Sequence, residues 1–227
     1  MCIRDSDGII NATDGFFTNE SSGIITINDI AGGQNEGIDN RFAFVNFGQI
    51  DITNIDGAPG IVSALIPSAI FANHGVLNIE NINSRGLWVH TNGQFLNKPT
   101  GQLNISNIVG DDAIEVLQNF ENEGIIDIDE VSGPSADGID SRNTFVNTGT
   151  ISIQNVDDSH GIFNTSFFTN DVGGVIDIDF FHDEGLRNEA NGTFTNKGDI
   201  SINQNSSATN SHGILNFGRI LSLIHIS

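Results

Sequence analysis

The stretch that decides the fold runs from residue 145 to residue 153 and has the sequence FVNTGTISI. An asparagine follows the phenylalanine by two residues, and a glycine then opens an alternating Ile-x-Ile segment. The steps between successive copies of this pattern are 27, 27, 24, 25, 25, 23 and 26 residues, and a repeat of this length indicates a solenoid of stacked coils. The F-x-N…G-x-[IL]-x-I pattern begins at Phe17, Phe44, Phe71, Phe95, Phe120, Phe145, Phe168 and Phe194.

Each repeat contains three short apolar pieces, which are a G-[IL] pair, the F-x-N segment and the G-x-[IL]-x-I segment. Alternation with a period of two sends both apolar side chains of the last segment to one face of a strand. We therefore predict an all-β fold, a right-handed parallel β-helix (solenoid) of about 8 coils of about 25 residues each. A further apolar residue follows the last isoleucine by three positions, namely Ile30, Ile55, Ile82, Ile108, Val131, Val156 and Phe181, with Asn205 in the eighth repeat.

The phenylalanine and asparagine columns are predicted to be structural. Phenylalanine rings of successive coils can stack inside the rod when they are offset, and identical asparagines at one corner can hydrogen-bond along the stack. We also expect these asparagines to adopt the left-handed turn conformation that Asn tolerates. The predicted ladder consists of Asn19, Asn46, Asn73, Asn97, Asn122, Asn147, Asn170 and Asn196.

The chain is strongly acidic, and this limits its partners. It has 29 acidic and 8 basic residues, which gives a formal net charge of −21. Such a charge argues against nucleic acid, whose phosphates attract Lys and Arg, and against an anionic membrane surface. No apolar run approaches the length of a membrane span, so we expect no membrane insertion. The charge suits a protein in a salty or calcium-containing extracellular medium.

The two ends of the chain differ in sequence from the repeats. Back-translated, residues 1–6 and residues 221–227 fit reverse-complementary DNA strings that resemble the mosaic-end adapter of transposase-based sequencing libraries. We interpret both as adapter-derived segments, typical of a metagenomic fragment, and residues 7–220 as a single β-helix segment. The chain's one Met and one Cys, Met1 and Cys2, lie in the first of them.

The G-I-x-N, F-x-N-x-G and G-x-I-x-I strings resemble the repeats of right-handed parallel β-helix proteins, especially long secreted or surface adhesin-like chains of bacteria. The resemblance covers nearly all of residues 7–220 and includes the pectin-lyase-like superfold. It implies an extracellular or cell-surface location, a structural or adhesive role without catalysis, and a glycan or surface protein as partner beside flanking coils of a longer chain. The same fold also hosts polysaccharide lyases and glycoside hydrolases, so an enzyme with its site partly outside this stretch is the alternative.

Three short strings resemble motifs of polygalacturonase-type glycosidases, namely residues 11–15 (NATDG), 110–113 (GDDA) and 159–161 (SHG). Glycoside hydrolysis needs two carboxylates about 5–10 Å apart, whereas Asp14 and Asp111 fall about four coils, or roughly 19 Å, from one another. Asp112 and His160 occupy the position just before the G-[IL] pair, which we interpret as a solvated corner. The sequence therefore predicts no catalytic and no cofactor-binding residue.

Two further candidates concern ligands. Asp127 and Asp129, together with Asp177 and Asp179, offer oxygen ligands that calcium accepts, but one coil separates the two pairs, which places them about 10 Å apart. A solvated acidic face is the favoured interpretation, and these four residues remain the weak metal candidates. Trp88, the single tryptophan, is predicted to be either an exposed platform for sugar stacking or a packing residue at the end of a strand.

Overall fold

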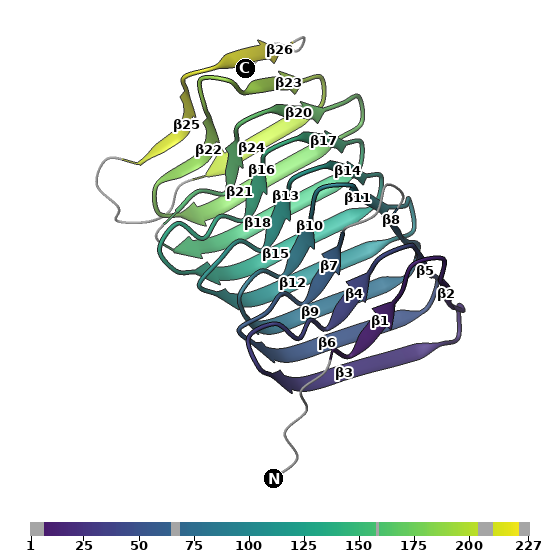
Figure 1. The fold of residues 1–227 in the computed structure, drawn as a ribbon. Coiled ribbons are helices and arrows are strands. Elements are labelled where there is room, and N and C mark those ends of the chain that lie inside the picture. The colour runs from purple at the N-terminus through teal and green to yellow at the C-terminus, as the bar shows by residue number, and fades with distance from the viewer. Residues whose placement is uncertain (1–6, 65–68, 158, 204–210, 223–227) are drawn as a thin grey trace.

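The computed structural model describes residues 7–64, 69–157, 159–203 and 211–222, and these residues contain no helix. Their strands form three parallel sheets that stack along one axis (Figure 1). The chain passes through one strand of each sheet in every coil, so each strand pairs with the strands three places before and after it in sequence order. The prediction of an all-β parallel β-helix of about eight coils is thereby confirmed.

We name the sheets A, B and C in the order in which the chain meets them. Sheet A contains β1 (Ile9–Asn11), β4 (Ile38–Asn40), β7 (Ile61–Ser63), β10 (Leu87–Val89), β13 (Ile114–Val116), β16 (Ile139–Ser141), β19 (Ile162–Asn164), β22 (Glu184–Asn188) and β25 (His212–Asn216). Sheet B contains β2 (Phe16–Asn19), β5 (Ala43–Asn46), β8 (Ala69–Asn73), β11 (Gly93–Asn97), β14 (Asn119–Asn122), β17 (Thr144–Asn147), β20 (Phe167–Asn170), β23 (Thr193–Asn196) and β26 (Arg219–Ser222). Sheet C contains β3 (Ile24–Ala31), β6 (Gln49–Asp56), β9 (Val76–Asn83), β12 (Gln102–Val109), β15 (Ile125–Ser132), β18 (Thr150–Asp157), β21 (Val175–Phe181) and β24 (Asp199–Asn203).

The three sheets correspond to the three apolar pieces of the repeat. The G-[IL] pair leads into sheet A, F-x-N forms sheet B, and G-x-[IL]-x-I forms sheet C. Equivalent residues of successive coils pair in register, so that Phe95 lies beside Phe120 and Ile105 beside Ile128. Register therefore turns every position of the repeat into a column that runs along the rod. Asn205 and the predicted adapter segments, apart from Leu221 and Ser222 in β26, lie outside the described residues.

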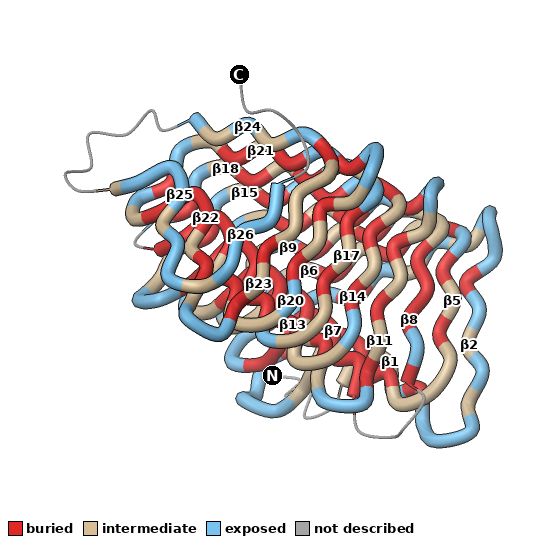
Figure 2. The backbone as a smooth tube through the Cα atoms, turned by 90° about the horizontal axis from the view of Figure 1, so that it is seen from above, coloured by how far each residue is buried: buried red, intermediate tan, exposed pale blue. Residues whose placement is uncertain are grey.

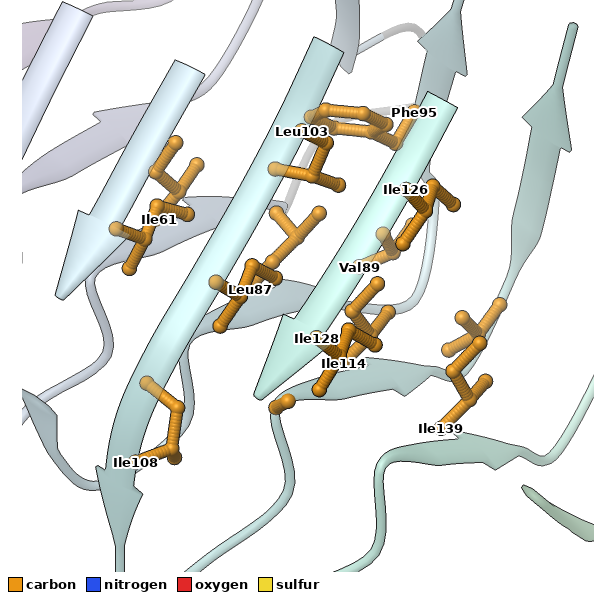
Figure 3. Packing of buried hydrophobic residues seen from close by; sticks show 14 of the residues in the cluster. Ile61, Leu87, Val89, Phe95, Leu103, Ile108, Ile114, Ile126, Ile128 and Ile139 are labelled. Atoms are coloured by element: carbon orange, nitrogen blue, oxygen red, sulfur yellow. The ribbon is translucent and has the colours of Figure 1, made fainter. Parts of the chain in front are cut away.

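The core is one continuous apolar cluster enclosed by the three sheets (Figure 3). Leu103 and Ile126 of sheet C face Leu87 and Ile114 of sheet A across it. The additional apolar column after the Ile-x-Ile segment is buried in every described coil, at 0–3% exposed. The sequence prediction of that column is thus confirmed from Ile30 to Phe181.

Glycine is needed where coils approach most closely. A Cβ on Gly138, in the G-[IL] pair of its coil, would lie 2.6 Å from the carbonyl oxygen of Gly161 in the next coil. Real side chains do not tolerate such a contact, so the pair requires a residue without a side chain here.

The phenylalanine column is a stack of eight rings. Successive ring centroids lie 4.5–5.2 Å apart with interplanar angles of 5–21°. Offset stacks of this kind add to the burial of apolar area. All the rings after Phe17 are at most 2% exposed, so the predicted internal column is confirmed.

The asparagine ladder is also complete. The Nδ2 of each ladder asparagine donates to the Oδ1 of the asparagine in the next coil over 2.7–2.9 Å, from Asn19 through to Asn196. A second, interrupted ladder ends the strands of sheet A, where Asn11 donates to Asn40 and Asn164 donates to Asn188. These bonds satisfy side-chain amides that are buried at the corners.

The predicted left-handed conformation of the ladder asparagines is wrong, because none of them has a positive φ. That conformation occurs instead in sheet C, one residue before the additional apolar column, at Asp29, Asn54, Asn81, Asn107, Glu130, Asn155 and Phe180, with φ of 52–59°. Asn and Asp tolerate this region, whereas other side chains meet the backbone there. Glu130 and Phe180 therefore carry local strain.

Burial falls from the middle of the rod towards its two ends (Figure 2). The strands of the central coils alternate between buried and more exposed positions, and exposed residues lie both in these strands and in the turns between them. The first strand of sheet B, β2, and the last strands of sheets A and B, β25 and β26, are largely exposed. The variable outer positions of the central coils are therefore where a site has to be sought.

Candidate functional site: the outer face of sheet A

Two columns of side chains form this face. The central column comprises the middle residues of the strands, Ile10, Asp39, Val62, Trp88, Glu115, Asp140, Phe163, Arg187 and Leu215. The second column directly precedes the G-[IL] pair and comprises Asp7, Glu36, Pro59, Arg85, Asp112, Asp137, His160, Glu184 and His212, with Ala113 in place of the glycine of its coil. Every member of the second column except Pro59 can carry a charge, so ionisable groups gather along one line.

A groove of about 550 Å³ lies over the first four coils of this face. Its walls include Trp88, His90, Arg41 and Arg85, together with turn residues 33–34 and 57–59. Ligand-binding clefts have volumes of about 300–1,000 Å³, so the groove is large enough for a small ligand. It combines an aromatic ring with cationic and anionic side chains.

Trp88 is half-buried in this groove. The guanidinium of Arg85 lies 4.9 Å from the centroid of the indole, and the ring of His90 meets the indole edge with 4.4 Å between centroids. The indole Nε1–H is buried and has no hydrogen-bond partner within the described part of the chain. Trp88 therefore has an N–H without a partner among the described residues and one ring face against Arg85. This half-buried position is intermediate between an exposed platform for sugar stacking and a packing residue at the end of a strand.

The first acidic group, Asp7, Glu36 and Asp39, borders the groove. One carboxylate oxygen from each residue lies within 4.8 Å of the others. Arg41 Nε donates to Asp39 Oδ2 over 2.7 Å, while Asp39 Oδ1 is buried without a partner within the described residues. Burial, with the neighbouring carboxylates Asp7 and Asp39 adding to it, raises the pKa of Glu36 to about 7.

The second acidic group, Asp112, Asp137 and Asp140, is buried throughout. These residues are 2%, 5% and 1% exposed, and one oxygen from each lies within 4.8 Å of the others. Burial and the charge of Asp137 raise the pKa of Asp112 to about 9. Burial also raises the pKa of Asp140 to about 6, although a hydrogen bond from Arg142 opposes the shift. Three carboxyl groups this close and this buried cannot all stay ionised without a partner.

Hydrogen bonds connect this group to the next two coils. The backbone N–H of Asp137 donates to Asp112 Oδ1 over 2.8 Å, and Ser159 Oγ donates to Asp137 Oδ1 over 2.5 Å. His160 Nδ1 lies 2.7 Å from the same oxygen, and its Nε2 lies 3.0 Å from Glu184 Oε2 without hydrogen-bond geometry. Burial disfavours the charged ring, yet the bond to Asp137 raises the pKa of His160 overall.

Arginines neutralise the other acids of this neighbourhood. Arg142 Nη2 lies 2.6 Å from Asp140 Oδ2, and its Nη1 lies 3.5 Å from Glu115 Oε1. Arg85 also pairs with Glu115 and reaches Asp111 Oδ2 with Nη2 at 2.9 Å. Neither arginine contacts Asp112 or Asp137 in these pairings, and His160 contacts Asp137 through Oδ1.

The two acidic groups share the sequence acid-Gly-Ile-Asp-x-Arg. It occurs at residues 36–41 and again at residues 137–142. In each case an acid of the preceding coil, Asp7 or Asp112, occupies the same column as the first acid of the motif and completes the group. The second copy differs from the first in that all three of its carboxyl groups are buried.

The prediction that Asp112 and His160 are solvated corner residues is wrong. Asp112 is 2% and His160 is 9% exposed, and both contact Asp137. Asp137 lies in the coil between those of Asp112 and His160 and occupies the same column. Asp137 was visible in that column as an acid directly above another acid, which is the signal that identifies the cluster.

The four sheet C aspartates lie as their spacing predicts. Asp127 and Asp177 are separated by one intervening coil, and so are Asp129 and Asp179. Within the described ranges, neither group of three acids with mutually close oxygens includes any of them. Calcium binding at these four residues stays a prediction.

No helix among the described residues is long and apolar enough to cross a membrane. Comparison of the chain with protein-family models, with curated proteins and with solved structures gives no match.

Proposed function

We propose that the chain is a structural and adhesive segment of a β-helical rod in a secreted or bacterial cell-surface protein, and that it performs no catalysis by itself. Continuous phenylalanine and asparagine columns support a stiff rod, because each coil is bonded to the next at the same places. The net charge of −21 supports an extracellular location through its solubility in salt. Flanking coils of a longer chain would extend the same stack.

The observation that carries the adhesive part is the groove around Trp88. Sugars present apolar C–H faces and hydroxyl groups together, so their sites combine an aromatic ring with a few polar side chains. Trp88 supplies the half-buried ring, while Arg41 and Asp39 supply charged donors and acceptors on the same wall. We therefore propose a glycan as the partner of this face.

A glycan array probed with the whole chain tests this proposal. We expect binding to a restricted set of glycans, and Trp88→Ala should weaken it at least about tenfold, which corresponds to about 1.4 kcal/mol. Phe167→Ala is the matched control, because Phe167 is an exposed aromatic residue at 58% on sheet B, away from the groove. Equal binding by both variants, or no binding by the unmodified chain, contradicts the proposal.

A carbohydrate-active enzyme of the β-helix type is the second candidate, and one observation favours it. Asp112 and Asp137 have carboxylate oxygens within 4.8 Å, and the raised pKa of Asp112 keeps a proton available, as glycoside hydrolysis requires of one carboxyl group. Their exposures of 2% and 5% argue against it, because a sugar ring has to touch both groups.

Release of reducing sugars or of unsaturated uronic acids from a polysaccharide panel tests the enzyme. If the chain is adhesive and not catalytic, the whole chain should release neither product. Release that disappears in Asp112→Asn and persists in Trp88→Ala would replace it with the enzymatic one.

A further inference from the structure

The buried acidic group at Asp112, Asp137 and Asp140 is an oxygen-only set of ligands built from two neighbouring coils. Asp112 precedes β13, Asp137 precedes β16, and Asp140 is the middle residue of β16. Pairing of Ile114 with Ile139 fixes the register, so the column places Asp112 directly beside Asp137. One oxygen of each carboxylate lies within 4.8 Å of the other two.

Hydrogen bonding leaves an oxygen of each carboxylate free for a ligand. Within the described residues, Asp112 and Asp137 accept all of their hydrogen bonds on Oδ1. Asp140 pairs through Oδ2 with Arg142. Its Oδ1 is buried and has no partner in the described part of the chain, and the whole residue is 1% exposed. A buried carboxylate oxygen that accepts no hydrogen bond is available as a ligand for a cation.

The donor set selects the class of ligand. Three carboxylates without His or Cys favour a hard cation such as calcium or magnesium. Two oxygens bound to one calcium ion at about 2.3–2.6 Å lie at most about 5 Å apart, which the 4.8 Å limit satisfies. Magnesium at about 2.0–2.1 Å needs a tighter octahedral set. A single ion also fits where a sugar ring does not.

We propose that Asp112, Asp137 and Asp140 bind one calcium ion, which joins two neighbouring coils on the outer face of sheet A. The ion places positive charge beside the free oxygens of Asp112 and Asp137, which the two nearby arginines do not contact and His160 approaches only at Asp137 Oδ1. Backbone carbonyls or water molecules complete its coordination shell. This site is separate from the groove at Trp88 and from the aspartates of sheet C.

Trp88 provides a built-in probe for this site. In the register of sheet A, Trp88 lies beside Glu115 of the next coil, and Glu115 lies beside Asp140 of the coil after that. Trp88 is therefore two strand spacings, about 10 Å, from Asp140 along the rod. The chain has one Trp and no Tyr. Terbium is a luminescent substitute for calcium, and excitation of Trp88 should therefore produce terbium emission that calcium suppresses.

The experiment uses the whole chain after removal of metals with a chelator. We expect saturable terbium emission, its suppression by calcium at concentrations at least about tenfold below those of magnesium, and a rise in melting temperature with calcium. Asp112→Asn and Asp140→Asn should each lower the affinity of the chain for calcium at least about tenfold. Asp112→Asn retains the Asp140–Arg142 pair and relieves buried charge, so it remains informative if Asp140→Asn fails to fold.

Glu80→Gln and Asp199→Asn are the matched controls on sheet C, because both acids are exposed and belong to neither calcium candidate. Both variants should leave calcium affinity unchanged. The proposal is overturned if the unmodified chain shows no calcium-dependent change. It is equally overturned if Asp112→Asn binds calcium as the unmodified chain does, or if the sheet C variants abolish binding instead. Glycan binding on the array is a separate readout, so either proposal can fail while the other stands.

Discussion

Replacing Asn122 by aspartate exchanges one NH2 group for an oxygen in the middle of the buried ladder. Asn122 Nδ2 donates to Asn147 Oδ1 over 2.7 Å, to the backbone oxygen of Thr150 over 3.2 Å and to that of Gly124 over 3.4 Å. Its Oδ1 accepts from Asn97 Nδ2 over 2.8 Å. An ionised aspartate retains the last bond and points a charged oxygen at the three former acceptors. The substitution therefore changes the hydrogen bonding and hardly changes the volume.

The size of the effect follows from these contacts. Each lost hydrogen bond costs about 1 kcal/mol, and the acceptors left unsatisfied add to that. A buried charge without a partner costs about 3–5 kcal/mol. Together with the two shorter hydrogen bonds, this leads us to expect Asn122→Asp to lower the free energy of unfolding by about 5–7 kcal/mol at pH 8. For a chain of this length, about 1 kcal/mol lowers the melting temperature by about 2–4 °C, which gives a decrease of roughly 10–28 °C.

Thermal melting followed by circular dichroism measures this effect, and the pH dependence separates its causes. Burial raises the folded-state pKa of the new carboxyl group, so its destabilisation is greatest at high pH and shrinks as the group gains a proton on acidification. Asn196→Asp is the control, because Asn196 ends the ladder and is only half-buried, and among the described residues its Nδ2 donates to Gly198 alone. A central variant no less stable than the terminal one, or a deficit that does not shrink at pH 4, would refute the ladder's energetic role.

Three further predictions concern single positions. Phe180→Asn should raise the free energy of unfolding by about 0.5–1 kcal/mol in urea denaturation, because Phe180 has φ of 55° where Asn is tolerated; an unchanged midpoint contradicts the strain. Phe120→Ala should lower the free energy of unfolding by about 3–5 kcal/mol. Phe16 is 81% exposed, so Phe16→Ala should lower it by less than about 0.5 kcal/mol. Equal losses in the two variants would contradict a stabilising role of the ring stack. The pKa of Glu36 is raised from 4.5 to about 7, so its stabilising contribution is complete below pH 4.5 and is lost as the pH rises through 7. The melting temperature of Glu36→Gln, measured against pH, should therefore decline less between pH 4.5 and 7 than that of the unmodified chain. Parallel declines in the two proteins would contradict the raised pKa of Glu36.

The fold could be predicted from the sequence because its determinants are repeated in every coil. Phe120 and Phe145 occupy equivalent positions in the sequence, and a parallel stack turns equivalent positions into neighbours. The same logic predicted the ladder bond between Asn122 and Asn147. The left-handed residues were misplaced because φ depends on where sheet C bends, and the sequence around Glu130 or Phe180 does not reveal that bend.

The acidic site was harder to predict because its residues are few and vary from coil to coil. Asp112 and Asp137 lie 25 residues apart, and their proximity follows only when every member of their column is compared with the next. Burial was a second obstacle. The turns and arginines around sheet A cover its outer face, so Asp140 is 1% exposed although it faces away from the core.

A parallel in-register stack places identical charges in adjacent coils at about 4.8 Å unless the sequence prevents it. On sheet C it is prevented, because Ser152 separates Asp127 from Asp177. On sheet A the chain does the opposite, since Asp112 and Asp137 occupy adjacent coils and Asp140 is added to them. Three acids that are all buried together depart from the separation seen on sheet C, and such local departures in otherwise consistent sequences concentrate at functional sites. The calcium proposal therefore rests on a difference between two faces of the same rod, and not on acidity alone.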